Sequence, residues 1–190
     1  MSLDRNFILN LAHRDTDINE YLLTLYNLIV QGNYKTVVEI GAGQSTYALT
    51  AAVNETKGEF YSIDLTQEAR LRSFPEGEGI LDNEIRYHFI QGNDLQIVKK
   101  WTKEIDFLFI DSDHSYDHVR LQLEDWLPWV RKGGMIALHD TAQTDEIIKG
   151  CRQALNEFLK LSSLKYSQPY YRAVHLLDTK LLGMSILVKI

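Results

Sequence analysis

Short β-branched or apolar runs alternate with amphipathic stretches along most of the chain, and this alternation predicts strands that alternate with helices. The predicted strands are residues 36–40, 58–64, 85–90, 106–110 and 135–138. The apolar stripes predict helices over residues 17–30, 44–54, 66–74, 94–101, 116–130 and 144–161. Repeated strand–helix units of this kind are typical of a parallel sheet that is covered by helices.

The pattern changes after Pro169. Residues 173–177 and 184–190 are apolar runs, and the segment between them is too short for a helix, which predicts a β-hairpin. The hairpin introduces antiparallel pairing, so we expect an α/β fold with a mixed sheet. Ligands of such sheets bind beyond the carboxyl ends of the strands, so the residues that follow each strand are the candidates for function.

Composition and charge narrow the classes of function. The chain has 190 residues, of which 45% are hydrophobic and 24% charged, so we expect one domain over 1–190 with a helical segment at 1–33 and a core at 34–190. The net charge of −6 disfavours nucleic acid as a partner. No apolar run is long enough to cross a membrane, and the N-terminus is charged where a signal peptide would be apolar. Cys151 is the single cysteine, so we expect a cytoplasmic protein.

The residues around the ends of the first three predicted strands suit a nucleoside. The turn Gly41–Gly43 lets the backbone approach a ligand closely, and Glu39 precedes it. Asp64 ends the second strand, where its carboxylate can either accept both hydroxyls of a ribose or cap the next helix. Asn93 and Asp94 follow the third strand, where a short polar side chain can either receive an adenine amino group or begin a helix.

A second group of polar residues follows the fourth and fifth predicted strands. Because neighbouring parallel strands lie about 4.8 Å apart, residues that end both strands can share a pocket. Two carboxylates and an imidazole there could hold Mg²⁺ or Mn²⁺. Alternatively, a histidine could act as a general base for an acceptor hydroxyl. The residues concerned are Asp111, Asp113, His114, His139 and Asp140.

Together these segments resemble the class I S-adenosylmethionine-dependent methyltransferases. The matching segments are VVEIGAG at 37–43, FYSID at 60–64, QGND at 91–94 and the glycine-led fifth strand before the hairpin. The resemblance covers residues 36–190. It implies a Rossmann-like three-layer sandwich with a seven-stranded mixed sheet whose last strand is antiparallel. It also implies S-adenosyl-L-methionine (SAM) as the cofactor.

The resemblance further implies roles for individual residues. The residues that would bind the cofactor are Glu39, Gly41, Ala42, Gly43, Ser45, Asp64, Asn93, Asp94 and Asp111. IDSDHSY at 110–116 and GGMIALHD at 133–140 are similar to small-molecule O-methyltransferases within this family. That subgroup implies a metal held by Asp111, His139 and Asp140, although His139 stands where its metal-dependent members usually carry a carboxylate.

We therefore predict an enzyme that methylates a small-molecule acceptor from SAM, most simply at a hydroxyl oxygen. His114 or His139 would be the catalytic base, and Mg²⁺ or Mn²⁺ is an optional second cofactor. Neither nucleic acid nor a membrane is expected as a partner, and association into a homo-oligomer stays open. Two alternatives also stay open: a metal-dependent hydrolase that uses the Asp and His residues, and a non-enzymatic nucleotide-binding module.

Overall fold

The computed structural model describes residues 5–12, 18–66, 86–142, 149–166, 170–176 and 183–190. The chain divides into two compact units, residues 1–93 and residues 94–190, and each is described by itself. The expectation of one domain over the whole chain stays a prediction. Among the described residues, no helix combines the length and the apolar character that crossing a membrane requires.

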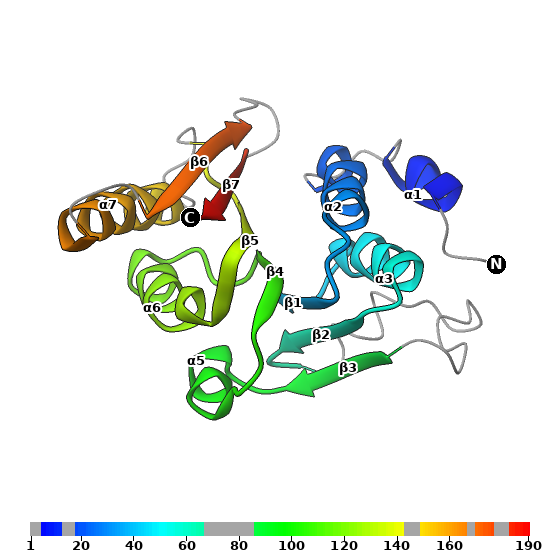
Figure 1. Ribbon diagram of the computed structural model, residues 1–190, viewed down its shortest axis with the longest axis horizontal. Coiled ribbons are helices and arrows are strands. Elements are labelled where there is room, and N and C mark those ends of the chain that lie inside the picture. The colour runs from blue at the N-terminus through cyan, green and yellow to red at the C-terminus, as the bar shows by residue number, and fades with distance from the viewer. Residues whose placement is uncertain (1–4, 13–17, 67–85, 143–148, 167–169, 177–182) are drawn as a thin grey trace. The chain divides into compact units, whose positions relative to one another are not determined.

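The first unit contains a parallel ladder of three strands with helices packed beside it. Its elements are α1 (Arg5–Ala12), α2 (Asn19–Gly32), β1 (Thr36–Ile40), α3 (Ser45–Thr56), β2 (Glu59–Asp64) and β3 (Arg86–Gln91). β2 pairs in parallel with both β1 and β3, and α2 lies beside both α1 and α3 (Figure 1). The predicted apolar stripe of α2 is fully buried at Leu22, Leu25 and Ile29, which explains why this helix forms.

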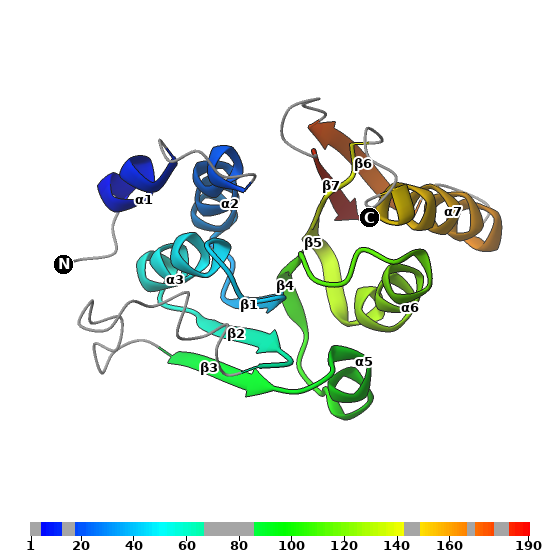
Figure 2. The same ribbon diagram turned by 180° about the vertical axis from the view of Figure 1, so that it is seen from behind.

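The second unit contains the remaining strands and a pair of packed helices. Its elements are α5 (Asp94–Ile97), β4 (Ile105–Ile110), α6 (Tyr116–Trp126), β5 (Val130–His139), α7 (Lys149–Tyr166), β6 (Tyr171–Leu176) and β7 (Met184–Lys189), with short 3₁₀ helices at Val98–Lys100 and Leu127–Trp129. β4 pairs in parallel with β5, whereas β7 pairs antiparallel with both β5 and β6. α6 packs against α7, as Figure 2 shows from behind.

The order of the strands is β3-β2-β1-β4-β5-β7-β6. This confirms the predicted α/β fold, in which a seven-stranded mixed sheet of the Rossmann-like type carries an antiparallel last strand. The predicted hairpin is also confirmed, because β6 and β7 pair directly. The active edge of such a sheet lies where its parallel strands end, so the residues after β1, β2, β4 and β5 are the ones to compare with the sequence.

The largest difference from the sequence prediction concerns the start of β5. The sequence predicted a helix over 116–130 and a strand that starts at 135, with Gly133 and Gly134 between them, but α6 ends at Trp126 and both glycines lie within β5. The pairing with β4 shifts register there, Gly133 has φ of +73°, and a Cβ on Gly134 would lie 2.7 Å from a Val130 methyl. The glycines are therefore needed for an irregularity inside the strand.

Two other predicted elements need comment. α1 was not predicted as a separate helix, since only a helical N-terminal segment was expected there. The predicted helix at 66–74 falls, apart from Thr66, outside the described residues. Asp17, the start of the helix predicted over 17–30, also falls outside them, and the described helix α2 begins at Asn19.

Gly58 and Gly43 form a matched pair for testing the packing of the first unit. A Cβ on Gly58 would lie 2.3 Å from the carbonyl oxygen of Lys35, whereas a Cβ on Gly43 would meet no described atom within 4 Å. Gly58→Ala should therefore lower the free energy of unfolding by about 1–3 kcal/mol. Gly43→Ala should leave it unchanged or raise it by up to about 1 kcal/mol. Urea unfolding measures both, and equal values would contradict the described packing.

Candidate functional site

Glu39 is a completely buried carboxylate near the end of β1. The Ser45 hydroxyl donates to its Oε1 at 2.6 Å, and the Thr46 and Ser62 hydroxyls both donate to its Oε2 at 2.7 Å. An ionised carboxylate is stable away from water only with donors of this kind. Because Ser45 and Thr46 begin α3 and Ser62 lies in β2, Glu39 ties three elements together. We call these four residues the Glu39 network.

The Glu39 network supports the glycine turn that follows β1. Gly41 has φ of +91°, a conformation that glycine adopts without strain, and its N–H donates to the Ile63 carbonyl at 2.9 Å. The Ala42 N–H donates to Asp64 Oδ2 and the Thr66 N–H donates to Asp64 Oδ1, both at 3.0 Å. Asp64 is only half-buried, and each carboxylate oxygen can accept a second hydrogen bond. The fold therefore orients Asp64 without exhausting its capacity to accept.

The predicted cofactor residues of the first unit thus divide into two groups. Glu39 and Ser45 lie inside the protein and hold the turn. Gly43 borders open space, since no described atom lies within 4 Å of a Cβ added there. Asn93 is exposed in the bend after β3. Direct contact with a ligand is thereby left to the turn backbone, Asp64 and Asn93, and their roles stay predictions.

Asp94, the first residue of α5, is buried and is held by two side chains of α6. Gln122 Nε2 donates to Asp94 Oδ2 at 2.9 Å, and His118 Nε2 lies 3.0 Å from Asp94 Oδ1. Gln122 Nε2 also donates to the Ser112 hydroxyl at 2.8 Å. The sequence prediction did not include these partners. The i, i+4 spacing of His118 and Gln122 places them on one helix face, which was the only available signal.

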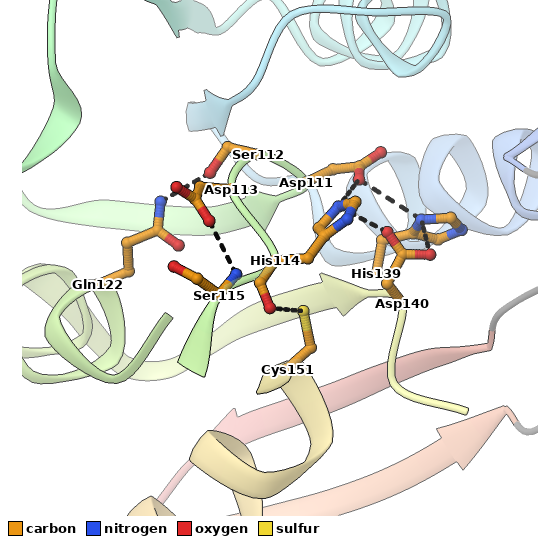
Figure 3. Close-up of polar contacts among 9 residues, drawn as sticks. All are labelled: Asp111, Ser112, Asp113, His114, Ser115, Gln122, His139, Asp140 and Cys151. Atoms are coloured by element: carbon orange, nitrogen blue, oxygen red, sulfur yellow. Dashed lines mark hydrogen bonds and ion pairs between the residues drawn. The ribbon is translucent and has the colours of Figure 1, made fainter. Parts of the chain in front are cut away.

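Four of the residues predicted to meet after β4 and β5 do so, and we call them the Asp–His cluster: Asp111, His114, His139 and Asp140 (Figure 3). His114 Nε2 lies 2.7 Å from Asp140 Oδ2 and 3.7 Å from Asp111 Oδ1. His139 Nδ1 lies 3.5 Å from Asp111 Oδ1 and 3.3 Å from Asp140 Oδ1. Asp113 does not join them, because its carboxylate accepts the Ser115 N–H at 2.7 Å just before α6.

The Asp–His cluster contains a constellation that suits a metal ion. Asp111, His139 and Asp140 each offer one ligand atom, and these three atoms lie within 4.8 Å of one another. Asp140 Oδ1 is buried, and among the described residues its polar neighbour is His139 Nδ1 at 3.3 Å. Asp140 also has φ of +57°, a strained conformation for a residue other than glycine. A strained, buried carboxylate that is paired with two histidines is typical of a functional site rather than of a packing position.

Charge pairing inside the Asp–His cluster shifts the pKa of each member. The Asp111 and Asp140 carboxylates raise the pKa of His114 to about 10. Burial alone would lower the pKa of His139, but the same two carboxylates outweigh it and raise the value to about 10. Burial also favours the neutral forms of Asp111 and Asp140, yet the hydrogen bonds from the histidines hold both pKa values below the ordinary range. At neutral pH the cluster therefore holds two cations and two anions.

Cys151 lies beside the Asp–His cluster without belonging to it. Burial is the main cause that raises the pKa of its thiol to about 12, and Sγ lies 3.8 Å from the His114 carbonyl oxygen (Figure 3). A thiol that stays protonated is a poor nucleophile. Cys151 therefore supports the loop that carries His114.

Solved structures of known proteins share this fold. The O-methyltransferase from Bacillus cereus in complex with SAH matches with a TM-score of 0.70 and 20% identity, over 97% of this chain and 87% of that chain. A putative caffeoyl-CoA O-methyltransferase from Staphylococcus aureus matches with a TM-score of 0.65 and 18% identity, over 97% of this chain and 90% of that chain. TomG, an O-methyltransferase from Streptomyces achromogenes in complex with SAM, matches with a TM-score of 0.62 and 15% identity, over 96% of this chain and 88% of that chain. At these identities the likeness establishes the fold.

The family assignment comes from the sequence itself. The model of a family described as methyltransferase domain matches residues 38–141, which is more than half of the chain. The matched segment includes the glycine turn, Asp64, Asp94 and the whole Asp–His cluster. This chain therefore belongs to the methyltransferase-domain family.

Proposed function

We propose that this methyltransferase uses SAM to methylate a hydroxyl oxygen of a small molecule. The observation that carries the proposal is the family match over 38–141, since it spans both groups of polar residues described above. The structural relatives support the finer statement, because the Bacillus cereus enzyme holds SAH, TomG holds SAM, and both are O-methyltransferases. No feature of the described residues favours the hydrolase or the binding module over this function.

The residues of the first unit fit the nucleoside part of SAM. Asp64 has unused acceptor capacity for a ribose diol, and its orientation is fixed by the N–H groups of Ala42 and Thr66. The backbone beside Gly43 is open to a close approach by the ligand. Bound SAM supplies an electrophilic methyl group. Glu39 acts behind the turn, by holding the backbone that the ligand contacts.

The Asp–His cluster fits the acceptor. A hydroxyl becomes a better nucleophile when its proton leaves, and His114 is the more accessible of the two histidines. Since its pKa is raised to about 10, His114 is a cation at neutral pH and can stabilise an acceptor oxyanion by donating a hydrogen bond. To accept the acceptor's proton, His114 must first lose its own, either near pH 10 or when another positive charge beside Asp111 and Asp140 lowers its pKa.

A divalent metal ion would supply that charge, and the residues present fit one. Asp111, His139 and Asp140 would hold Mg²⁺ or Mn²⁺, because two carboxylates and one imidazole suit either ion. The bound ion would lower the pKa of an acceptor hydroxyl. The ion would replace the protonated histidines as the positive charge beside Asp111 and Asp140. His139 would then lose its proton to become a ligand, and His114 would lose its proton and could act as a base.

Charge and cysteine content support the finer proposals on partners and location. The net charge of −6 supports a small-molecule acceptor over a nucleic acid. The only cysteine of the chain is buried, and a single cysteine can form no internal disulfide, which is compatible with a cytoplasmic location.

Removing the charge of Asp64 tests the ribose contact. Asp64→Asn keeps the shape and one acceptor oxygen but loses the charge-assisted hydrogen bonds. Its affinity for S-adenosylhomocysteine (SAH), the demethylated product of SAM, should fall by about 10–100-fold, since a hydrogen bond to a charged group contributes about 1.5–3 kcal/mol. Isothermal calorimetry measures this, with Asp106→Asn, outside both groups, as the control. An Asp64→Asn protein that binds SAH as well as wild type does would place the ribose elsewhere.

Filling the space beside the turn tests the approach of the cofactor. Gly43→Val should abolish measurable SAH binding, because the branched side chain occupies space that the ligand needs, while Gly43→Ala should weaken it less. The melting temperature should stay within a few degrees of wild type, since no described atom lies within 4 Å of a Cβ at this position. SAH binding that persists in folded Gly43→Val would show that the cofactor does not lie against this turn.

Metal binding should depend on pH in a direction that the pKa values determine. Below about pH 10 His139 carries a proton that must leave before the ring can ligate a metal, whereas the carboxylates are already ionised. Affinity for Mn²⁺ should therefore rise by about tenfold per pH unit between pH 6 and 8 for each proton released. Calorimetry at pH 6, 7 and 8 measures the slope.

Asp111→Asn should abolish Mn²⁺ binding, and the neighbouring Asp113→Asn should not. Mn²⁺ binding that is independent of pH, or that survives in Asp111→Asn, would contradict the proposed ligand set.

If chelation leaves methyl transfer unchanged, the histidines act without a metal. The rate should then rise with pH toward about 10, where His114 and His139 lose their protons.

A further inference from the structure

The chain leaves the extended path of β5 at Asp140. The antiparallel ladder between β5 and β7 pairs Leu138 with Ser185. If the strand continued without a turn, Thr141 would lie three residues beyond Leu138, which is about 10 Å further along the strand. The side chain of Thr141 would then be out of reach of Ser185.

Thr141 nevertheless contacts Ser185 directly. The Ser185 hydroxyl donates to Thr141 Oγ1 at 2.7 Å, and both side chains are fully buried. This bond requires the chain to turn at Asp140, whose φ is +57°. The bond also stabilises the turn, because an extended Asp140 would separate the two hydroxyls.

Ser185 is held in turn by His175 of β6. The two residues face each other in the ladder between β6 and β7, and His175 Nδ1 lies 2.7 Å from Ser185 Oγ. We call Thr141, Ser185 and His175 the Thr141 chain. It runs from the residue after Asp140 across β7 to β6, since β7 lies between β5 and β6 (Figure 1). A hydroxyl can accept from one neighbour while it donates to the other, so Ser185 can bridge the two.

Two further contacts fix the backbone after Asp140. The Thr141 N–H donates to the Gly183 carbonyl at 3.3 Å. Gly183 has φ of +72°, and a Cβ there would lie 2.7 Å from Ala142 Cβ and 2.8 Å from Ala142 N. A strained conformation persists only where the surrounding structure over-determines it. The Thr141 chain and Gly183 supply that constraint for Asp140.

The turn matters because it orients the Asp140 carboxylate, with Oδ2 at 2.7 Å from His114 Nε2 and Oδ1 at 3.3 Å from His139 Nδ1. We propose that Thr141 is a positioning residue, whose hydrogen bond to Ser185 holds Asp140 in the left-handed conformation that pairs it with both histidines. His175 acts one step further away, by orienting Ser185. The purpose of this arrangement rests on the proposed function, in which Asp140 belongs to the Asp–His cluster.

Variants that remove or restore one hydroxyl test the proposal. Thr141→Val keeps the shape of the side chain and loses the hydroxyl, Thr141→Ser keeps the hydroxyl, and Ser185→Ala removes the same bond from its other end. The control is Thr56→Val in the first unit, where the buried Thr56 hydroxyl donates to the Val53 carbonyl. The control shares any general cost of losing a buried threonine hydroxyl.

Three measurements are made on wild type and on each variant. Crystal structures give the φ of Asp140 and the distance from His114 Nε2 to Asp140 Oδ2. Calorimetry gives the affinities for Mn²⁺ and for SAH, and thermal unfolding gives the melting temperature.

Thr141→Val and Ser185→Ala should both release the turn, so that Asp140 takes a negative φ and its Oδ2 moves out of hydrogen-bond distance of His114. Affinity for Mn²⁺ should fall by about 10–100-fold, the usual effect of removing the support of a ligand. Thr141→Ser should restore the conformation and the affinity. Thr56→Val should change neither, whatever its melting temperature.

An unchanged Asp140 conformation in folded Thr141→Val or Ser185→Ala overturns the proposal, because the hydroxyls would then only satisfy each other. A Thr141→Ser protein that behaves like Thr141→Val also overturns it, since shape and not the hydroxyl would hold the turn. Should Thr141→Val fail to fold, Ser185→Ala decides the outcome. Wild type that binds no SAH would overturn the proposed function, whereas the positioning role is decided by the crystal structures alone.

Discussion

A carboxyl group removed from water is stable only when hydrogen-bond partners surround it, and three carboxyl groups of this methyltransferase are in that position. Glu39, Asp94 and Asp140 are all less than 10% exposed, and each lies in or just after a strand of the sheet or at the start of the helix that follows one. Each has a partner from another part of the chain: hydroxyls for Glu39, Gln122 for Asp94, and His114 for Asp140. Satisfying these buried charges therefore aligns the loops that carry the chemistry.

The three carboxylates do different work because their donors differ. The hydroxyls that donate to Glu39 are neutral and come from the start of α3 and from β2, so this residue supports the glycine turn. Asp140 is paired with histidines that can lose a proton, so the charge of its cluster can change when a ligand or an ion enters. The same physical requirement thus produces a fixed support in one place and an adjustable site in another.

Much of the fold was predictable, because short buried strands and amphipathic helices have distinct periodicities. β1 matched its prediction to the residue, and β4 differed by one residue at its start. The start of β5 could not be predicted, since a glycine pair has the same local signature at the end of a helix and at an irregularity in a strand. Only the pairing with β4, which is not local, distinguishes the two cases.

The candidate site was predictable to the extent that strand ends determine it. Asp111, His139 and Asp140 follow adjacent parallel strands, so their meeting was expected from the sheet alone. The contacts of Gln122 and His118 with Asp94 depend on how α6 is rotated against α5, which a single sequence does not encode in its periodicity. Whether a buried polar residue binds or merely packs is likewise decided by its partners.

The central claim, that the glycine turn and Asp64 bind the nucleoside of SAM, is tested most directly by a crystal structure of the wild-type protein with SAH. We expect both ribose hydroxyls within hydrogen-bond distance of the Asp64 carboxylate, with the ligand lying against the backbone of Gly41–Gly43. SAH bound away from Asp64, or a structure at saturating SAH in which this turn carries no ligand, would contradict the account.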